Sequence, residues 1–137
     1  MNWIGETEME QKILNLTQHV ATPEQIEAGV FEPIYYKSEI QALLTFEEIP
    51  SKMEMEARAR RIMTFTHTEA QIQKTSCTKV MIGGAPYFMS YLENTFRENG
   101  VFTPVYAFSK RESVDQPQPD GSVKKTSVFR HAGFVEV

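Results

Sequence analysis

The sequence has little of what disulfide-stabilised or membrane-inserted proteins need. Cys77 is the single cysteine among 137 residues, so no disulfide can form within the chain, and we expect a reducing environment. No apolar run approaches the length of about 18 residues that a membrane helix needs, and the chain does not open with a charged and then apolar leader. We therefore expect a cytoplasmic protein with no membrane partner.

Basic charge is also scarce. The chain has 14 Lys and Arg against 18 Asp and Glu, and its net charge is -4. A protein that covers duplex DNA or RNA needs a basic face to neutralise many phosphates, so we expect no duplex nucleic acid partner. A small phosphorylated ligand needs only a few local donors. The three histidines and Cys77 lack the close spacing of metal ligands, and we expect neither a metal nor a cofactor.

Neither internal repeats nor a linker divides the chain, and we expect one domain over residues 1–137. Its most informative stretch runs from Lys79 to Ser90. The apolar residues 79–82 predict a strand that is buried on both faces. Gly83 and Gly84 permit a turn with backbone angles that other residues cannot easily adopt. Pro86 suits the first position of a helix, and a helix there directs free N–H groups towards a phosphate site. A Gly-Gly pair that only makes a tight turn is the alternative.

Other elements follow from hydrophobic spacing and capping signals. Thr22 with Gln25 predicts a helix start and Gly29 its end, while Ser51 with Glu54 starts a longer helix. We interpret the methionines of that helix as core and its arginines as a solvated face. The predicted elements are an irregular or short helical lead-in at 1–11, strands at 12–17, 79–82 and 103–108, helices at 22–29, 38–44, 51–73 and 86–100, coil at 30–37, and a hairpin of 111–116 and 123–131, with 134–137 finishing or extending the sheet.

These elements predict an α/β fold that is Rossmann-like, with a mainly parallel sheet, crossover helices and a C-terminal antiparallel hairpin. In such a sheet, ligands bind where the carboxyl ends of the strands meet their loops. Because three polar clusters follow the predicted parallel strands, we expect them to converge on one edge. They are Thr17, Gln18 and His19; Gly83, Gly84, Ala85 and Pro86; and Ser109, Lys110 and Arg111.

The expected chemistry of this edge is that of a phosphate and ribose site. Backbone N–H groups after Gly83 can hold a phosphate oxygen, and Arg111 can clamp one with two hydrogen bonds. Thr17, Gln18 and Ser109 can donate to or accept from a ribose or a base.

Residues 83–90, with the sequence Gly-Gly-Ala-Pro-Tyr-Phe-Met-Ser, resemble the Gly-Gly-Thr-Lys-x-Met-Ser type of signature of CRISPR-associated Rossmann fold (CARF) domains. Those domains bind cyclic oligoadenylates, usually across a homodimer axis, and some of them are ring nucleases that cleave the ligand without a metal. The other ligand-contacting motif of that family follows the first strand, which is the position of residues 17–19 here. Ala85 and Pro86 depart from the Thr-Lys of the family, and this removes a hydroxyl and an amine that help to hold phosphate.

The resemblance implies a homodimer that binds a cyclic oligoadenylate-type messenger of antiviral defence and cleaves it by attack of a ribose 2′-hydroxyl on the neighbouring phosphate. Arg111 would then face the developing charge, with His19 or Glu112 as acid or base. Weaker candidates for the site are Lys110, Ser113 and His131. A loop hydrogen bond of His19 and a surface ion pair of Arg111 with Glu112 are the structural alternatives.

Two readings without catalysis remain open. One is a cyclic-nucleotide sensor or sponge, which needs the same edge of the sheet but leaves its ligand intact. The other is a structural or interaction protein without a nucleotide ligand, in which the Gly-Gly turn is only a turn and the C-terminal hairpin pairs with another chain.

Overall fold

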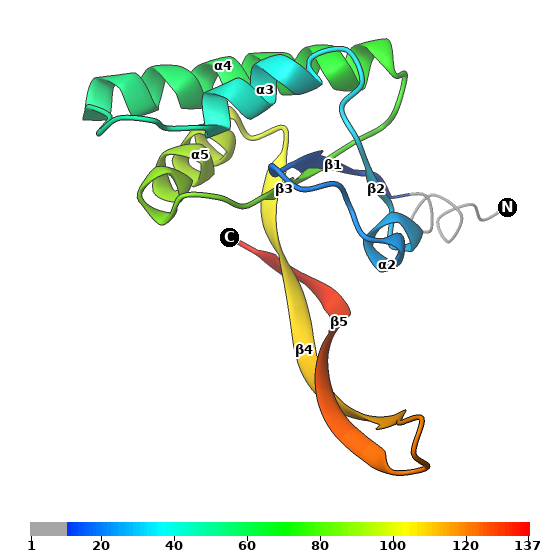
Figure 1. Cartoon of the computed structure of the whole chain (residues 1–137). Coiled ribbons are helices and arrows are strands. Elements are labelled where there is room, and N and C mark those ends of the chain that lie inside the picture. Colours follow the sequence, from blue (N-terminus) through cyan, green and yellow to red (C-terminus); the bar gives the residue numbers. More distant parts are fainter. Residues whose placement is uncertain (1–10) are drawn as a thin grey trace, which may run out of the picture.

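A five-stranded sheet forms the centre of the protein, in the strand order β2-β1-β3-β4-β5 (Figure 1). The computed structural model describes residues 11–137, so the predicted lead-in falls almost wholly outside the described residues. The first four strands run parallel and the last pair is antiparallel. This confirms the α/β class, the mostly parallel sheet and the antiparallel hairpin. The strands are β1 (Ile13–Leu16), β2 (Val30–Phe31), β3 (Lys79–Ile82), β4 (Thr103–Pro117) and β5 (Val123–Glu136).

Local signals set the ends of the helices. Thr22 and Gln25 form a complete capping box at α2, the Ser51 hydroxyl accepts from the backbone N–H of Glu54 at α4, and α5 ends at Gly100, whose φ of 77° is left-handed. Each of these predicted signals is confirmed. The helices are α2 (Pro23–Glu27), α3 (Lys37–Leu44), α4 (Lys52–Ile72) and α5 (Pro86–Asn99).

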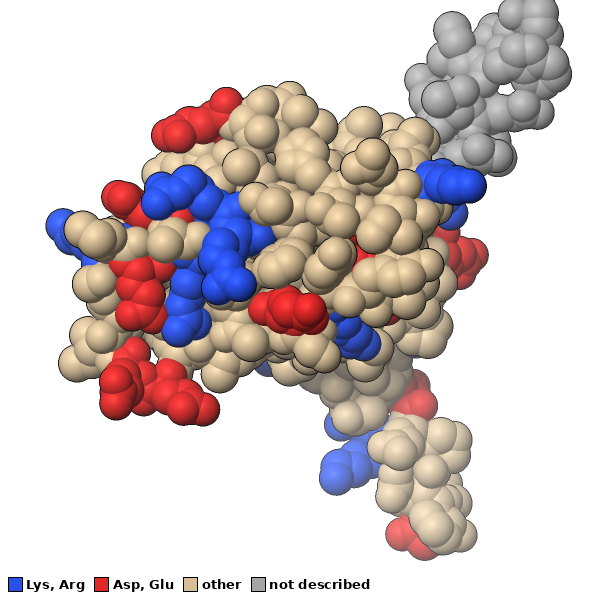
Figure 2. All heavy atoms as spheres, turned by 90° about the horizontal axis from the view of Figure 1, so that it is seen from above, with Lys and Arg blue, Asp and Glu red and all other residues tan. Residues whose placement is uncertain are grey.

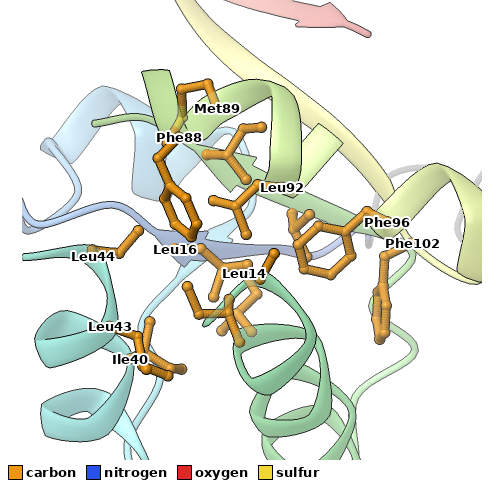
Figure 3. Packing of buried hydrophobic residues seen from close by; sticks show 14 of the residues in the cluster. Leu14, Leu16, Ile40, Leu43, Leu44, Phe88, Met89, Leu92, Phe96 and Phe102 are labelled. Atoms are coloured by element: carbon orange, nitrogen blue, oxygen red, sulfur yellow. The ribbon is translucent and has the colours of Figure 1, made fainter. Parts of the chain in front are cut away.

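The main core lies between one face of the sheet and the helices α3, α4 and α5 (Figures 1 and 3). Leu14 of β1 and Phe88, Leu92 and Phe96 of α5 are fully buried there, so the apolar face of α5 packs on the sheet. On the other face, a smaller cluster joins Ile13, Val30, Met81 and Val105 with the half-buried Ala21 and Phe134.

Two charged side chains of α4 fix both ends of α3. Glu69 is fully buried, and its carboxylate accepts hydrogen bonds from the three backbone amides of residues 34–36 at 2.7 to 3.1 Å. Arg58 donates to the backbone oxygens of Leu43 and Thr45 at 3.2 and 2.7 Å. Arg58 is therefore a structural link between helices, whereas the sequence placed it on a solvated face.

The structure corrects two boundaries. Residues 30 and 31, predicted as coil, form the edge strand β2. Residues 103–117, predicted as a strand, a polar loop and a second strand, form the single strand β4. β3 pairs with β4 only at Thr103–Val105, and β4 continues with β5 alone as a ribbon that points away from the helices (Figure 1). Over residues 11–137, no helix has the length and apolar character to cross a membrane.

Candidate functional site

A cavity of about 360 Å³ lies at the carboxyl ends of β1 and β3, beside Tyr106 and Ala107 in the first half of β4. The loop after β1 contributes residues 17–20, and the turn after β3 contributes Gly83 and Gly84. Thr22 and Gln25, at the start of α2, and Tyr106 and Ala107 of β4 complete much of the wall. Two of the three clusters predicted to converge therefore do so.

The side chain of Asn15, on β1, holds the loop of residues 17–20 in place through hydrogen bonds. Its side chain is 1% exposed, and its carbonyl oxygen accepts from the backbone N–H and the hydroxyl of Thr17 at 2.9 and 2.7 Å. Its amide donates to the backbone oxygen of His19 at 2.8 Å and to the Glu32 carboxylate at 2.9 Å. These bonds fold the loop back over the strand end. Asn15 was not among the predicted site residues, although a lone amide inside an apolar run is a usable signal.

The predicted ligand-binding residues of this loop differ in how far their side chains are already engaged in hydrogen bonds within the protein. The Thr17 hydroxyl lies within hydrogen-bond distance of both Asn15 and the His19 backbone oxygen, so it holds the loop. The Gln18 amide donates to the Thr45 hydroxyl at 2.8 Å. The His19 imidazole is exposed and takes part in none of the side-chain hydrogen bonds found in residues 11–137. His19 is therefore the side chain most available to a ligand.

The two glycines of the second loop are required for different reasons. A Cβ on Gly83 would meet the Thr17 methyl group at 3.3 Å, so this glycine permits the two loops to approach closely. Gly84 has a φ of 148°, where side chains cause strain. At both positions the cavity wall is backbone, and a ligand can come close to the main chain.

Ala85 and Pro86 do not line this cavity, which corrects their predicted place in it. Ala85 is half-buried against the main core, and Pro86 lines a neighbouring hollow of about 530 Å³ that also includes Glu93.

Tyr106 contributes to both hollows, and its hydroxyl donates to Glu93 at 2.6 Å. Burial, followed by the hydrogen bond and the charge of Glu93, raises the pKa of Tyr106. Tyr106 was not among the predicted site residues.

The expectation that the third cluster reaches the same edge is wrong. None of its residues lines the cavity, because β4 continues as a strand and carries them out along the ribbon. There the Arg111 guanidinium lies 5.5 Å from the centre of the Phe129 ring, and Glu112 accepts from Arg130 at 3.2 Å. The displaced candidates are Ser109, Lys110, Arg111, Glu112 and Ser113.

Three remaining observations concern His131, the charge of the cavity wall and metal-binding groups. His131, a weaker candidate, is half-buried on β5, where its ring packs edge-on against Phe134 at 4.8 Å. Among the described residues, the cavity wall includes no Lys, Arg, Asp or Glu. Within residues 11–137, histidine, cysteine and acidic side chains do not gather in threes as metal ligands would.

Comparison with known proteins gives one match. The model of a family described as "Uncharacterized protein MJ1673 family" matches residues 11–135. The matched range includes both loops of the cavity and the whole ribbon. No curated protein and no solved structure matches the chain.

Proposed function

The chain belongs to the Uncharacterized protein MJ1673 family, and from the geometry of its cavity we propose that it binds a cyclic oligoadenylate-type nucleotide without cleaving it. The observation that carries this proposal is the meeting of residues 17–20 with Gly83 and Gly84 around one cavity at the carboxyl ends of parallel strands. This is the position at which open α/β sheets bind ligands. We include in this proposal that the sheet is of the Rossmann-like type.

The size and wall of the cavity suit one nucleotide unit. Ligand sites typically measure about 300 to 1,000 Å³, and the cavity, at about 360 Å³, lies near the lower limit. A base or ribose can approach the bare backbone of Gly83 and Gly84, and the His19 imidazole can donate a hydrogen bond to a phosphate. A ring of several nucleotides exceeds one such cavity, so in this proposal two copies of the chain share it as a homodimer.

Binding is favoured over cleavage because the predicted catalytic groups do not surround the cavity. In a ring nuclease, charged side chains must face the phosphate as its charge develops. Arg111 and Glu112 lie on the ribbon instead, and His19 alone does not supply both an acid and a stabilising cation. A sensor or sponge needs only the binding edge. Cleavage is an outcome of the test below.

Duplex nucleic acid is not part of the proposal. Over the face of the protein in Figure 2, the Lys and Arg side chains are interspersed with Asp and Glu. A duplex needs a continuous basic track along its phosphates.

The test is to measure melting temperature with cyclic di-, tri-, tetra- and hexaadenylates in EDTA, followed by chromatography of the ligand. A ligand present at about 100 times its Kd stabilises the native state by about 2.7 kcal/mol, which raises the melting temperature by several degrees. Val20 is 71% exposed and lines the cavity. Val20→Asp places a carboxylate where phosphate would bind, so we expect it to remove the ligand-induced shift.

The matched control is Val101→Asp, because Val101 is 52% exposed and precedes β4 at the opposite end of the sheet. It should keep the shift. If no nucleotide shifts the melting temperature, the proposed function is rejected. If both variants lose the shift equally, the ligand does not bind in this cavity. If linear or cyclic-phosphate products appear, the protein is a metal-independent ring nuclease and His19 is the first residue to replace.

A further inference from the structure

The ribbon of residues 109–131 is uncovered on both faces. It begins at the irregularity between Phe108 and Ser109 and continues to the pair of Pro117 with Val123. Phe129 is 67% exposed and Val123 is 59% exposed. An isolated two-stranded ribbon is marginally stable in water. A ribbon of this length therefore gains stability from a surface that covers it.

One face of the ribbon combines apolar and cationic side chains. Directly opposed residues of an antiparallel pair share a face, so Arg111 with Phe129, Asp115 with Lys125, and Pro117 with Val123 lie together. The Arg111 guanidinium lies over the Phe129 ring at 5.5 Å. We call these six residues the aromatic face.

The charge of the ribbon is opposite to that of the rest of the chain. The ribbon has an excess of two positive charges, whereas the whole chain carries -4, so the remaining residues carry -6. Residues 11–108 and 132–137, which form the described body, carry -3 of this charge. The ribbon is therefore attracted to the body of another copy. Its charged residues are the basic Lys110, Arg111, Lys124, Lys125 and Arg130 and the acidic Glu112, Asp115 and Asp120.

A complementary surface lies beside the loop between α3 and α4. A groove of about 500 Å³ is lined by residues 46–50 together with Met55 and Tyr87. Its walls are largely apolar, and Ile49 is 98% exposed. Glu47 and Glu48 form no ion pair with any residue in the range 11–137. The groove thus offers an apolar surface and two carboxylates that take part in none of these ion pairs.

The ribbon cannot reach the groove of its own chain, because it points away from the helices that carry the groove (Figure 1). We infer that the aromatic face of the ribbon docks in the groove of a second copy, with Phe129 against the apolar wall and Arg111 and Lys125 against Glu47 and Glu48. This inference does not depend on the nucleotide.

The interface area favours a reciprocal exchange. Nine residues of ribbon span about 30 Å, and two strands are about 10 Å wide, so one face offers about 300 Å². A single docked ribbon buries about 600 Å² over both surfaces, whereas two bury about 1,200 Å², the lower limit for a stable interface. We therefore assign a dimer with two-fold symmetry, in which each ribbon occupies the groove of its partner.

The test is a charge exchange in the full chain, followed by sedimentation equilibrium over a range of protein concentrations. Arg111→Glu with Lys125→Glu reverses the charge of these two positions on the ribbon. Glu47→Lys with Glu48→Lys reverses the charge of the two carboxylates beside the groove. Each double variant should raise the dimer Kd at least tenfold, and the four changes together should restore most of the affinity. The control is Glu24→Lys with Glu27→Lys on α2, which makes the same charge change at exposed sites and should leave the dimer intact.

Circular dichroism and melting temperature verify that every variant is folded. A wild-type chain that stays monomeric at all concentrations overturns the inference. It also fails if reversing the groove has no effect, if the control weakens the dimer as much, or if the combined variant stays monomeric. Binding of single-stranded RNA by the ribbon of a monomeric chain would likewise overturn it. A lost nucleotide shift with an intact dimer rejects only the proposed function.

Discussion

At the scale of single residues, Asn15 determines the shape of the cavity. Its buried side chain makes hydrogen bonds to Thr17, His19 and Glu32. Asn15→Ala leaves these groups without their partner, and we expect the free energy of unfolding to fall by about 2 kcal/mol. Urea denaturation measures this loss.

The control for Asn15 is Asn94→Ala. Asn94 is exposed, and its side chain accepts from Arg97 at 2.8 Å, so its replacement should cost less than about 0.5 kcal/mol. Equal losses at the two positions would show that the buried network contributes nothing beyond a surface hydrogen bond.

Tyr106 makes stability depend on alkaline pH. Because burial and Glu93 raise the pKa of its hydroxyl in the folded state, the unfolded chain loses this proton first, near pH 10. The stability that Tyr106 contributes is fully present below about pH 10 and is lost as the pH rises towards the folded pKa. Tyr106→Phe should remove this alkaline loss and should cost about 1 kcal/mol at neutral pH.

Urea denaturation at about pH 8 and about pH 11 compares the wild type with Tyr106→Phe. Tyr91→Phe is the control, because Tyr91 is also half-buried against the core, and it should keep the wild-type dependence on pH. If the free energy of unfolding of Tyr106→Phe still falls at alkaline pH as in the wild type, other groups cause that fall.

At the scale of elements, the ribbon and the centre of the sheet should differ in local stability. β1 and β3 are buried and paired on both sides, whereas beyond Phe108 β4 pairs with β5 alone. Amides that open locally exchange hydrogen faster than amides that need global unfolding. We expect amides of residues 109–116 to exchange much faster than those of β1 at low protein concentration.

Hydrogen exchange followed by mass spectrometry measures this difference. The amides of α2, which is short and exposed, serve as the internal reference for local opening. If the ribbon amides exchange as slowly as those of β1 at low concentration, the ribbon is stable by itself. It would then need no covering surface, which contradicts the basis of the proposed docking.

At the scale of the whole molecule, separation of charge between the ribbon and the rest of the chain makes association sensitive to salt. Exposed charges attract less strongly as ionic strength rises, since the screening length falls from about 10 Å at 0.1 M to about 3 Å at 1 M salt. The dimer Kd measured by sedimentation should therefore rise severalfold over this range of sodium chloride. A dimer that strengthens with salt would point to an interface governed by apolar contacts alone.

The sequence by itself determined the starts of α2 and α4, the end of α5 and the class of the fold. The signals at Thr22, Ser51 and Gly100 act within one turn of backbone, so neighbouring residues suffice to read them. The apolar runs at 12–17 and 79–82 and the Gly-Gly turn are also local, and they placed two of the three loops at the correct edge of the sheet.

Only the tertiary structure decided which side chains meet at that edge. Ser109 to Ser113 look like a loop because they are polar, but pairing with β5 satisfies their backbone groups and extends β4 through them. The partner of Asn15, Glu32, lies 17 residues further along the chain, and Tyr106 reaches the cavity because β4 lies beside β3. Contacts of this kind depend on strand pairing between distant segments, which no local pattern of residues specifies.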